Sequence, residues 1–156
     1  MDWRLLAWLE REDIAHDVYG ETQLHEGVLN LDDYKVLLTG AHPEYWSRKM
    51  YLELKDWVRN RGGKLMYLGG NGLNCEVEFT DAGTMIVFNE VCQGTTPPGF
   101  ESRMHKRVES EANLLGVVYD DAGAMTGAPY RVVDADHWVF AGTGLKKGDV
   151  FGEKSQ

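Results

Sequence analysis

A short loop, Gly40 to Trp46, brings together several side chains that can take part in chemistry. His42, Glu44 and Tyr45 lie within a few residues of one another, directly before a predicted helix. An imidazole or a carboxylate there can act as a general acid or base, and a phenol can be an oxyanion-type donor or a metal ligand. A structural alternative stays open, in which Glu44 complements the helix N-terminus while Tyr45 and Trp46 pack.

A second loop, Leu68 to Leu73, is rich in glycine and carries one amide side chain, that of Asn71. Asn71 lies between Gly70 and Gly72, where an enzyme with a nucleophile elbow would have Ser or Cys. Because an amide is not a nucleophile, we predict a hydrogen-bonding or anion-binding turn that uses Asn71 and exposed backbone N–H groups. The alternative is a tight turn in which Asn71 is simply left-handed.

Cys75 raises the question of a Cys-His-Glu hydrolase, with His42 or His105 as the base. We disfavour this reading because Cys75 begins a predicted strand and does not lie between glycines. The histidines show no spacing typical of a zinc site, whereas a hard-ion site built from oxygen ligands stays open. The five histidines are His16, His25, His42, His105 and His137.

Alternating helix and strand patterns in the first half predict the scaffold that positions these loops. The predicted helices are 2–12 and 47–61, and the predicted strands are 14–19, 35–39 and 64–68. Because parallel strands need crossover connections, this order predicts a doubly wound, mainly parallel sheet with helices on both faces. Both chemically interesting loops then lie at the carboxyl edge of the sheet, where ligands bind in such folds.

The second half predicts an antiparallel extension of this α/β domain. The expected strands, joined by Gly- and Asp-rich turns, are 75–79, 84–88, 114–119, 130–133 and 137–140. We treat residues 1–156 as one domain. Since such a domain usually opens with a strand and this chain opens with a helix, we expect the native polypeptide to be longer.

Composition narrows the class of protein. With 156 residues and 43% hydrophobic residues, the chain can bury one sizeable core. A formal net charge of -9 argues against a nucleic-acid or acidic-membrane partner. The sequence contains no apolar run of membrane-spanning length and no signal-peptide pattern, and its two cysteines do not form a disulfide framework. We therefore expect a cytoplasmic protein with reduced thiols.

Two stretches resemble a known enzyme family. The first stretch is Tyr34–Trp46, which ends in Gly-Ala-His-Pro-Glu-Tyr-Trp, and the second is Arg61–Gly72, which ends in Gly-Gly-Asn-Gly. They resemble the large (β) subunit of N,N-dimethylformamidase and its relatives. Leu114–Val117 and Pro129–Arg131 look similar to the same family. The resemblance implies a class I glutamine amidotransferase-like, flavodoxin-like fold that has lost its nucleophilic cysteine, consistent with Asn71.

The resemblance also implies amide hydrolysis at a mononuclear iron held by two tyrosines and a glutamate. Tyr45 lies in the matching string and is carried over as a ligand, and Glu101 is carried over as the glutamate. No second tyrosine is matched, and Arg4 stands near its expected place. The implied partners are a small amide substrate, a small subunit and further copies of the same chain in a homo-oligomer.

Two functions remain open from the sequence. One is a metal-dependent amidohydrolase domain that hydrolyses a C–N bond with a metal-activated water. The other is a non-catalytic amidotransferase-like module that binds a small ligand or another subunit. The fold does not choose between them, because function belongs to the site.

Overall fold

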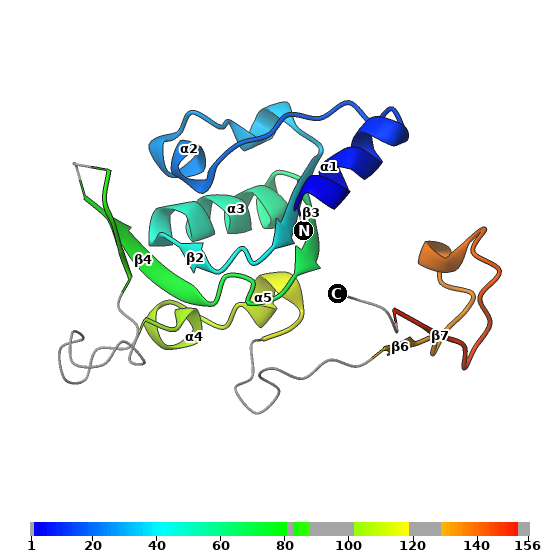
Figure 1. Ribbon diagram of the computed structural model, residues 1–156. Coiled ribbons are helices and arrows are strands. Elements are labelled where there is room, and N and C mark those ends of the chain that lie inside the picture. The colour runs from blue at the N-terminus through cyan, green and yellow to red at the C-terminus, as the bar shows by residue number, and fades with distance from the viewer. Residues whose placement is uncertain (1, 81–82, 88–101, 119–128, 153–156) are drawn as a thin grey trace. The chain divides into compact units, whose positions relative to one another are not determined.

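The computed structural model describes residues 2–80, 83–87, 102–118 and 129–152 (Figure 1). The chain divides into two compact units, Met1–Tyr119 and Asp120–Gln156. Each unit has its own elements, and the candidate loops belong to the first.

Short helices make up the N-terminal part of the first unit. They are α1 (Asp2–Arg11), α2 (Glu21–Glu26) and the 3-10 helix η1 (Leu31–Asp33). α1 confirms the predicted first helix. α2 begins where the Gly20 N–H donates to Gln23 Oε1 at 2.8 Å, and it ends at Gly27, whose φ is 81°.

The strand predicted for residues 14–19 is wrong, because this segment has no regular secondary structure. Its polar side chains are held by Tyr34 instead. Tyr34 Oη donates to Asp17 Oδ2 at 2.6 Å and lies 2.8 Å from Tyr19 Oη. Alternating apolar residues form a strand only where a neighbouring strand pairs with their backbone N–H and C=O groups. Here the segment is held by side-chain hydrogen bonds instead.

β1 (Val36–Ala41) and β3 (Lys64–Gly69) form a parallel pair. Their register runs from Val36 opposite Lys64 to Ala41 opposite Gly69. The two strands therefore end side by side, as the sequence predicted. Parallel strands cannot be joined by a tight hairpin, and the connection here passes through α3 (Arg48–Asn60).

α3 supplies the centre of the hydrophobic core. Met50, Tyr51, Leu54 and Trp57 recur at helical spacing and are at most 1% exposed. Ser47 caps the helix by accepting the Met50 N–H at 3.2 Å, which satisfies one of the N–H groups left open at a helix start. This confirms the predicted second helix.

Close packing fixes the residue that follows α3. Gly63 lies against the Trp57 indole, and a methyl group there would come within 2.1 Å of the ring. The chain can therefore enter β3 over the buried Trp57 only where a side chain is absent.

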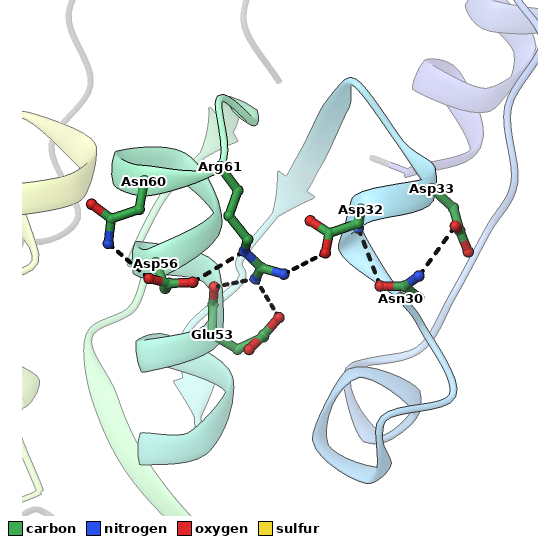
Figure 2. Close-up of polar contacts among 7 residues, drawn as sticks. All are labelled: Asn30, Asp32, Asp33, Glu53, Asp56, Asn60 and Arg61. Atoms are coloured by element: carbon green, nitrogen blue, oxygen red, sulfur yellow. Dashed lines mark hydrogen bonds and ion pairs between the residues drawn. The ribbon is translucent and has the colours of Figure 1, made fainter.

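Arg61 joins the end of α3 to the segment before β1 (Figure 2). Its guanidinium bonds Asp32 of η1 at 2.8 Å and Asp56 of α3 at 3.1 Å, and it also pairs with Glu53. Asn30 accepts the Asp32 N–H and so fixes the same turn. One cation thus holds carboxylates from two elements, and its charge also complements the helix C-terminus.

A second small sheet begins at the first loop. β2 (Tyr45–Trp46) pairs in parallel with β4 (Cys75–Phe79), which pairs antiparallel with β5 (Met85–Val87). β4 and β5 confirm two predicted strands and the start of an antiparallel extension.

A buried carboxylate fastens β4 to its surroundings. Glu76 is 7% exposed and bonds Arg48 Nε at 2.8 Å and Arg107 Nε at 2.7 Å. Two guanidinium partners offset much of the cost of burying this charge. Since Arg48 begins α3 and Arg107 ends α4 (Met104–Arg107), the contact joins three elements.

The strand predicted for 114–119 is wrong over 114–118: a short helix, α5 (Ala112–Leu115), ends at Gly116 with φ 76°, and residues 117 and 118 form no strand. Residue 119 lies outside the described residues. Glu109 ties α5 to α3: its carboxylate accepts from Tyr51 Oη at 3.0 Å, from Asn113 Nδ2 at 2.9 Å and from Lys55.

The second unit contains a two-stranded antiparallel sheet, β6 (Tyr130–Arg131) with β7 (Val150–Phe151), around a buried Val132. β6 is shorter than the predicted strand 130–133. The strand predicted for 137–140 is wrong, because Trp138–Phe140 is the 3-10 helix η3, begun by His137, whose ring accepts the Val139 N–H at 3.3 Å.

The described strands form small sheets, so the complete doubly wound sheet stays a prediction. The parallel pairing of β1 with β3 is the part of that prediction that the structure contains. Within the described residues, no helix has the length and apolar character needed to cross a membrane.

Gly63→Ala should lower the free energy of unfolding by about 1–3 kcal/mol, since the added methyl overlaps the Trp57 ring. Gly20→Ala is the matched control, because Gly20 has φ −84° and the nearest atoms to the new methyl are at 3.9 Å, an ordinary contact distance. Chemical denaturation measures both variants. Equal stability of the two would show that the Trp57 contact does not restrict residue 63.

Glu109→Gln should lower the free energy of unfolding at neutral pH. The difference in this free energy between the variant and the unaltered protein should be smaller at acid pH. The bond from Lys55, and then that from Asn113, hold the pKa of Glu109 below its ordinary value. A lowered carboxyl pKa stabilises the fold above the unfolded pKa, and this contribution is lost as the pH falls through the folded pKa. Thermal melts of both proteins from pH 7 to pH 3 measure the converging difference, and a constant difference would contradict it.

Candidate functional site

The two loops singled out in the sequence lie against each other at the ends of β1 and β3. The Gly70 N–H donates to Ala41 O at 2.9 Å, and the Leu73 N–H donates to Pro43 O at 2.8 Å. The Cys75 N–H then donates to Glu44 O at 2.9 Å. Backbone hydrogen bonds therefore join Gly40–Trp46 to Gly69–Cys75 along their length, as the convergence of the strand ends predicted.

Unusual backbone conformations gather in these joined loops. Ala41, Asn71 and Leu73 have φ values of 51°, 54° and 54°. Asn tolerates this left-handed region, whereas Ala and Leu are strained in it, at a cost of order 1–3 kcal/mol each. Among the described non-glycine residues, the one other positive φ belongs to Asp13. Strain held by surrounding contacts is common at binding and catalytic sites.

His42 lies over the glycine turn. A methyl group at Gly70 would come within 3.2 Å of His42 Cδ2 and 3.3 Å of Nε2, so the imidazole edge faces Gly70 directly. The side chain of His42 is exposed. In the part of the chain that the structure describes, its ring makes no hydrogen bond or ion pair, which leaves both nitrogens available.

Glu44 is half-buried, and its backbone is held from both sides: its N–H donates to His42 O at 2.8 Å, and its carbonyl accepts from Cys75. Its carboxylate has no partner among the described residues. Ser47, and not Glu44, caps the helix, and the charge complement expected from Glu44 at the helix N-terminus stays a prediction. Trp46 is 3% exposed and donates its indole N–H to Pro43 O at 2.9 Å, so the packing expected for Trp46 is confirmed.

Asn71 adopts the left-handed conformation that the structural alternative foresaw. Its carbonyl accepts the Asn74 N–H at 3.3 Å. Its backbone N–H and side-chain amide form no hydrogen bond within the described residues. The two interpretations of Asn71 are therefore compatible, because the turn conformation leaves its polar groups unengaged.

Gly72 is required because of its packing. It is not among the residues with positive φ, so its backbone conformation does not call for glycine. A methyl group there would instead come within 2.7 Å of the Tyr67 ring and of Leu115 Cδ1. The Gly72 N–H also donates to Tyr67 Oη at 2.9 Å.

The proposed iron ligands are placed only in part. Tyr45 lies in β2, half-buried, and is paired with Cys75 of β4. Glu101, the second proposed ligand, lies outside the described residues, as does any approach of its carboxylate to Tyr45. The described residues contain no group of three His, Cys, Asp or Glu side chains able to hold a metal. Of the residues named as ligands, Tyr45 is the one that lies within the described residues, and its role as a ligand stays a prediction.

Cys75 is buried in β4, with Asn74 Nδ2 at 3.6 Å from Sγ. The histidines considered as its base have other neighbours: His42 faces Gly70, and His105 Nδ1 lies 3.8 Å from Glu111 Oε2. A strand position and 2% exposure are typical of a packing thiol.

Sequence reasoning missed two polar contacts beside the loops. Tyr67 supports the glycine turn, and His25 Nδ1 lies 2.8 Å from Ser47 Oγ. Ser47 is 4% exposed and accepts the Met50 N–H, so the partly buried His25 contacts the residue that caps α3. Strand alternation places Tyr67 on the same face as Leu65, which was the one available signal for its inward position.

Comparison with known proteins gives one family. The family model described as N,N-dimethylformamidase beta subunit-like, C-terminal, matches residues 1–156. No solved structure matches.

Two curated relatives carry the same name. The N,N-dimethylformamidase beta subunit of Alcaligenes sp is 38% identical over 78 residues, which is 49% of this chain and 10% of that protein. The N,N-dimethylformamidase beta subunit of Paracoccus aminophilus is 40% identical over 73 residues, 46% of this chain and 9% of that protein. The matched segments thus cover about a tenth of the length of these relatives.

Gly72→Ala should destabilise the protein by about 1–3 kcal/mol, because the methyl group overlaps the Tyr67 ring and Leu115. Gly70→Ala should cost less, because the neighbouring His42 ring is exposed and can turn away. Denaturant titration of both variants gives the order. A larger loss for Gly70→Ala would contradict the packing seen at Gly72.

Proposed function

Because the chain belongs to the N,N-dimethylformamidase beta subunit-like, C-terminal family, we propose that it contributes to hydrolysis of the C–N bond of a small amide. The observation that supports this proposal is the gathering of unengaged polar groups on the joined loops. Within the described residues, the side chains of His42, Glu44 and Asn71 have no internal partner. Elsewhere in the first unit, the carboxylates of Glu76 and Glu109 are bound by neighbouring side chains.

The chemistry assigns one role to each group. Hydrolysis adds water to the amide carbonyl carbon, and collapse of the tetrahedral intermediate breaks the C–N bond to give an acid and an amine. The N–H groups of Asn71 would donate to the carbonyl oxygen as negative charge develops. His42 would take a proton from the attacking water and return it to the leaving nitrogen. Glu44, in the same loop, would stabilise the imidazolium that forms between the two transfers.

Iron belongs to the proposal through the family resemblance. Tyr45 is one oxygen donor of the type that such an ion binds. The proposed proton transfers are assigned to His42, while Glu44 and Asn71 stabilise the charges that develop during the reaction. Elemental analysis of the purified protein, together with a search for a visible tyrosinate-to-iron band, tests whether iron is present.

The relatives are named as beta subunits, so we also propose that the protein works in an assembly with a second, smaller subunit. A non-catalytic role is the second candidate function. It is favoured by Asn71, which cannot act as a nucleophile yet presents unengaged hydrogen-bonding groups. In that case the joined loops would bind a small amide without cleaving it.

Asn71→Gly should lower kcat/KM for N,N-dimethylformamide by about 10–100-fold while leaving the melting temperature nearly unchanged. Glycine accepts a φ of 54° without strain, so this change removes the side-chain amide and keeps the turn. The loss is that of a donor to the developing oxyanion. Release of dimethylamine by the purified protein measures turnover.

Cys75→Ser is the matched control and should retain turnover within a few fold, because a packing thiol takes no part in the reaction. A collapse of its activity without unfolding would restore the thiol mechanism. Full activity of Asn71→Gly would remove Asn71 from the site. Binding of the amide by the unaltered protein with no dimethylamine released would favour the non-catalytic module.

A further inference from the structure

Tyr67, a residue of β3, contacts the Gly70-Asn71-Gly72 turn in two ways. Its phenol oxygen accepts the Gly72 N–H at 2.9 Å. Its ring fills the space beside Gly72, where a methyl group would come within 2.7 Å of both Cε2 and Cζ. The side chain therefore supports the turn by a directional bond and by contact.

The other hydrogen bonds that hold this turn are made between backbone groups. The N–H groups of Gly70, Leu73 and Asn74 donate to carbonyl oxygens of Ala41, Pro43 and Asn71. Gly72 differs because its N–H is satisfied by a side chain. A single substitution can therefore remove the tie at Gly72 and leave the other three in place.

Gly72 lies between the two left-handed residues of the turn. Asn71 and Leu73 both have φ 54°, and such conformations persist only where surrounding contacts fix them. Leu73 is 2% exposed and is held by Pro43. Asn71 has less support, since its side chain has no partner within the described residues. The hydrogen bond from the Gly72 N–H to Tyr67 is thus the first contact after Asn71 in the chain that restrains the backbone.

We infer that Tyr67 is a positioning residue for the candidate site: it fixes the Gly72 N–H and thereby holds Asn71 with its amide and N–H groups presented to a bound amide. The expected effect of Tyr67 on amide binding rests on the proposed function. The placement of Asn71 by Tyr67 depends on the geometry alone.

Tyr67→Phe tests the bond apart from the packing, because phenylalanine keeps the ring that fills the space beside Gly72. Hydrogen exchange at the Gly72 N–H, followed by nuclear magnetic resonance on the full chain, should become at least tenfold faster. The backbone and side-chain amide resonances of Asn71 should shift. Tyr34→Phe is the matched control, since it removes phenol hydrogen bonds to Asp17 and Tyr19 at a segment outside both loops.

The functional consequence is measured with N,N-dimethylformamide as the probe. Tyr67→Phe should lower kcat/KM by about tenfold with its melting temperature close to that of Tyr34→Phe, a loss that general destabilisation would not produce. Unchanged Gly72 exchange and Asn71 resonances, or an equal effect of Tyr34→Phe, would overturn the inference. If the unaltered protein neither binds nor cleaves the probe, the proposed function fails, while the exchange and resonance data still decide the role of Tyr67.

Discussion

Burial of one face of α3 is the interaction on which the rest of the first unit depends. Tyr51, Leu54 and Trp57 are almost completely removed from water, and each such side chain contributes about 1.5–3 kcal/mol relative to an exposed one. Because α3 connects β1 to β3, the same burial brings those strands together in parallel. Gly63 lets the chain leave the helix directly across the Trp57 ring.

Charged contacts on the outside of this core fix the segments that the apolar face does not reach. Arg61 holds η1 against α3 (Figure 2), and Glu76 holds α3, α4 and β4 together through Arg48 and Arg107. Their carboxylates and guanidinium groups satisfy one another. In the joined loops, His42, Glu44 and Asn71 have no partner in the described part of the chain. The fully buried carboxylate of Glu111 likewise accepts no hydrogen bond there.

The joined loops combine a rigid backbone with unengaged side chains. Hydrogen bonds from Gly70, Leu73 and Cys75 to the first loop hold the backbone, including residues in strained conformations. A backbone held in this way loses little conformational entropy when its N–H and C=O groups bind a small ligand, because these groups are already in place.

The sequence by itself determined the helices α1 and α3, the strands β1, β3 and β4, and the meeting of the two loops, because these follow from local periodicity and from parallel strands ending together. It also carried the family resemblance that the family match supports. Only the tertiary structure decided that 14–19 is not a strand, that Ser47 caps α3 and that Gly72 is required by Tyr67. Those outcomes depend on which distant side chains meet, and a pattern of neighbouring residues does not contain that information.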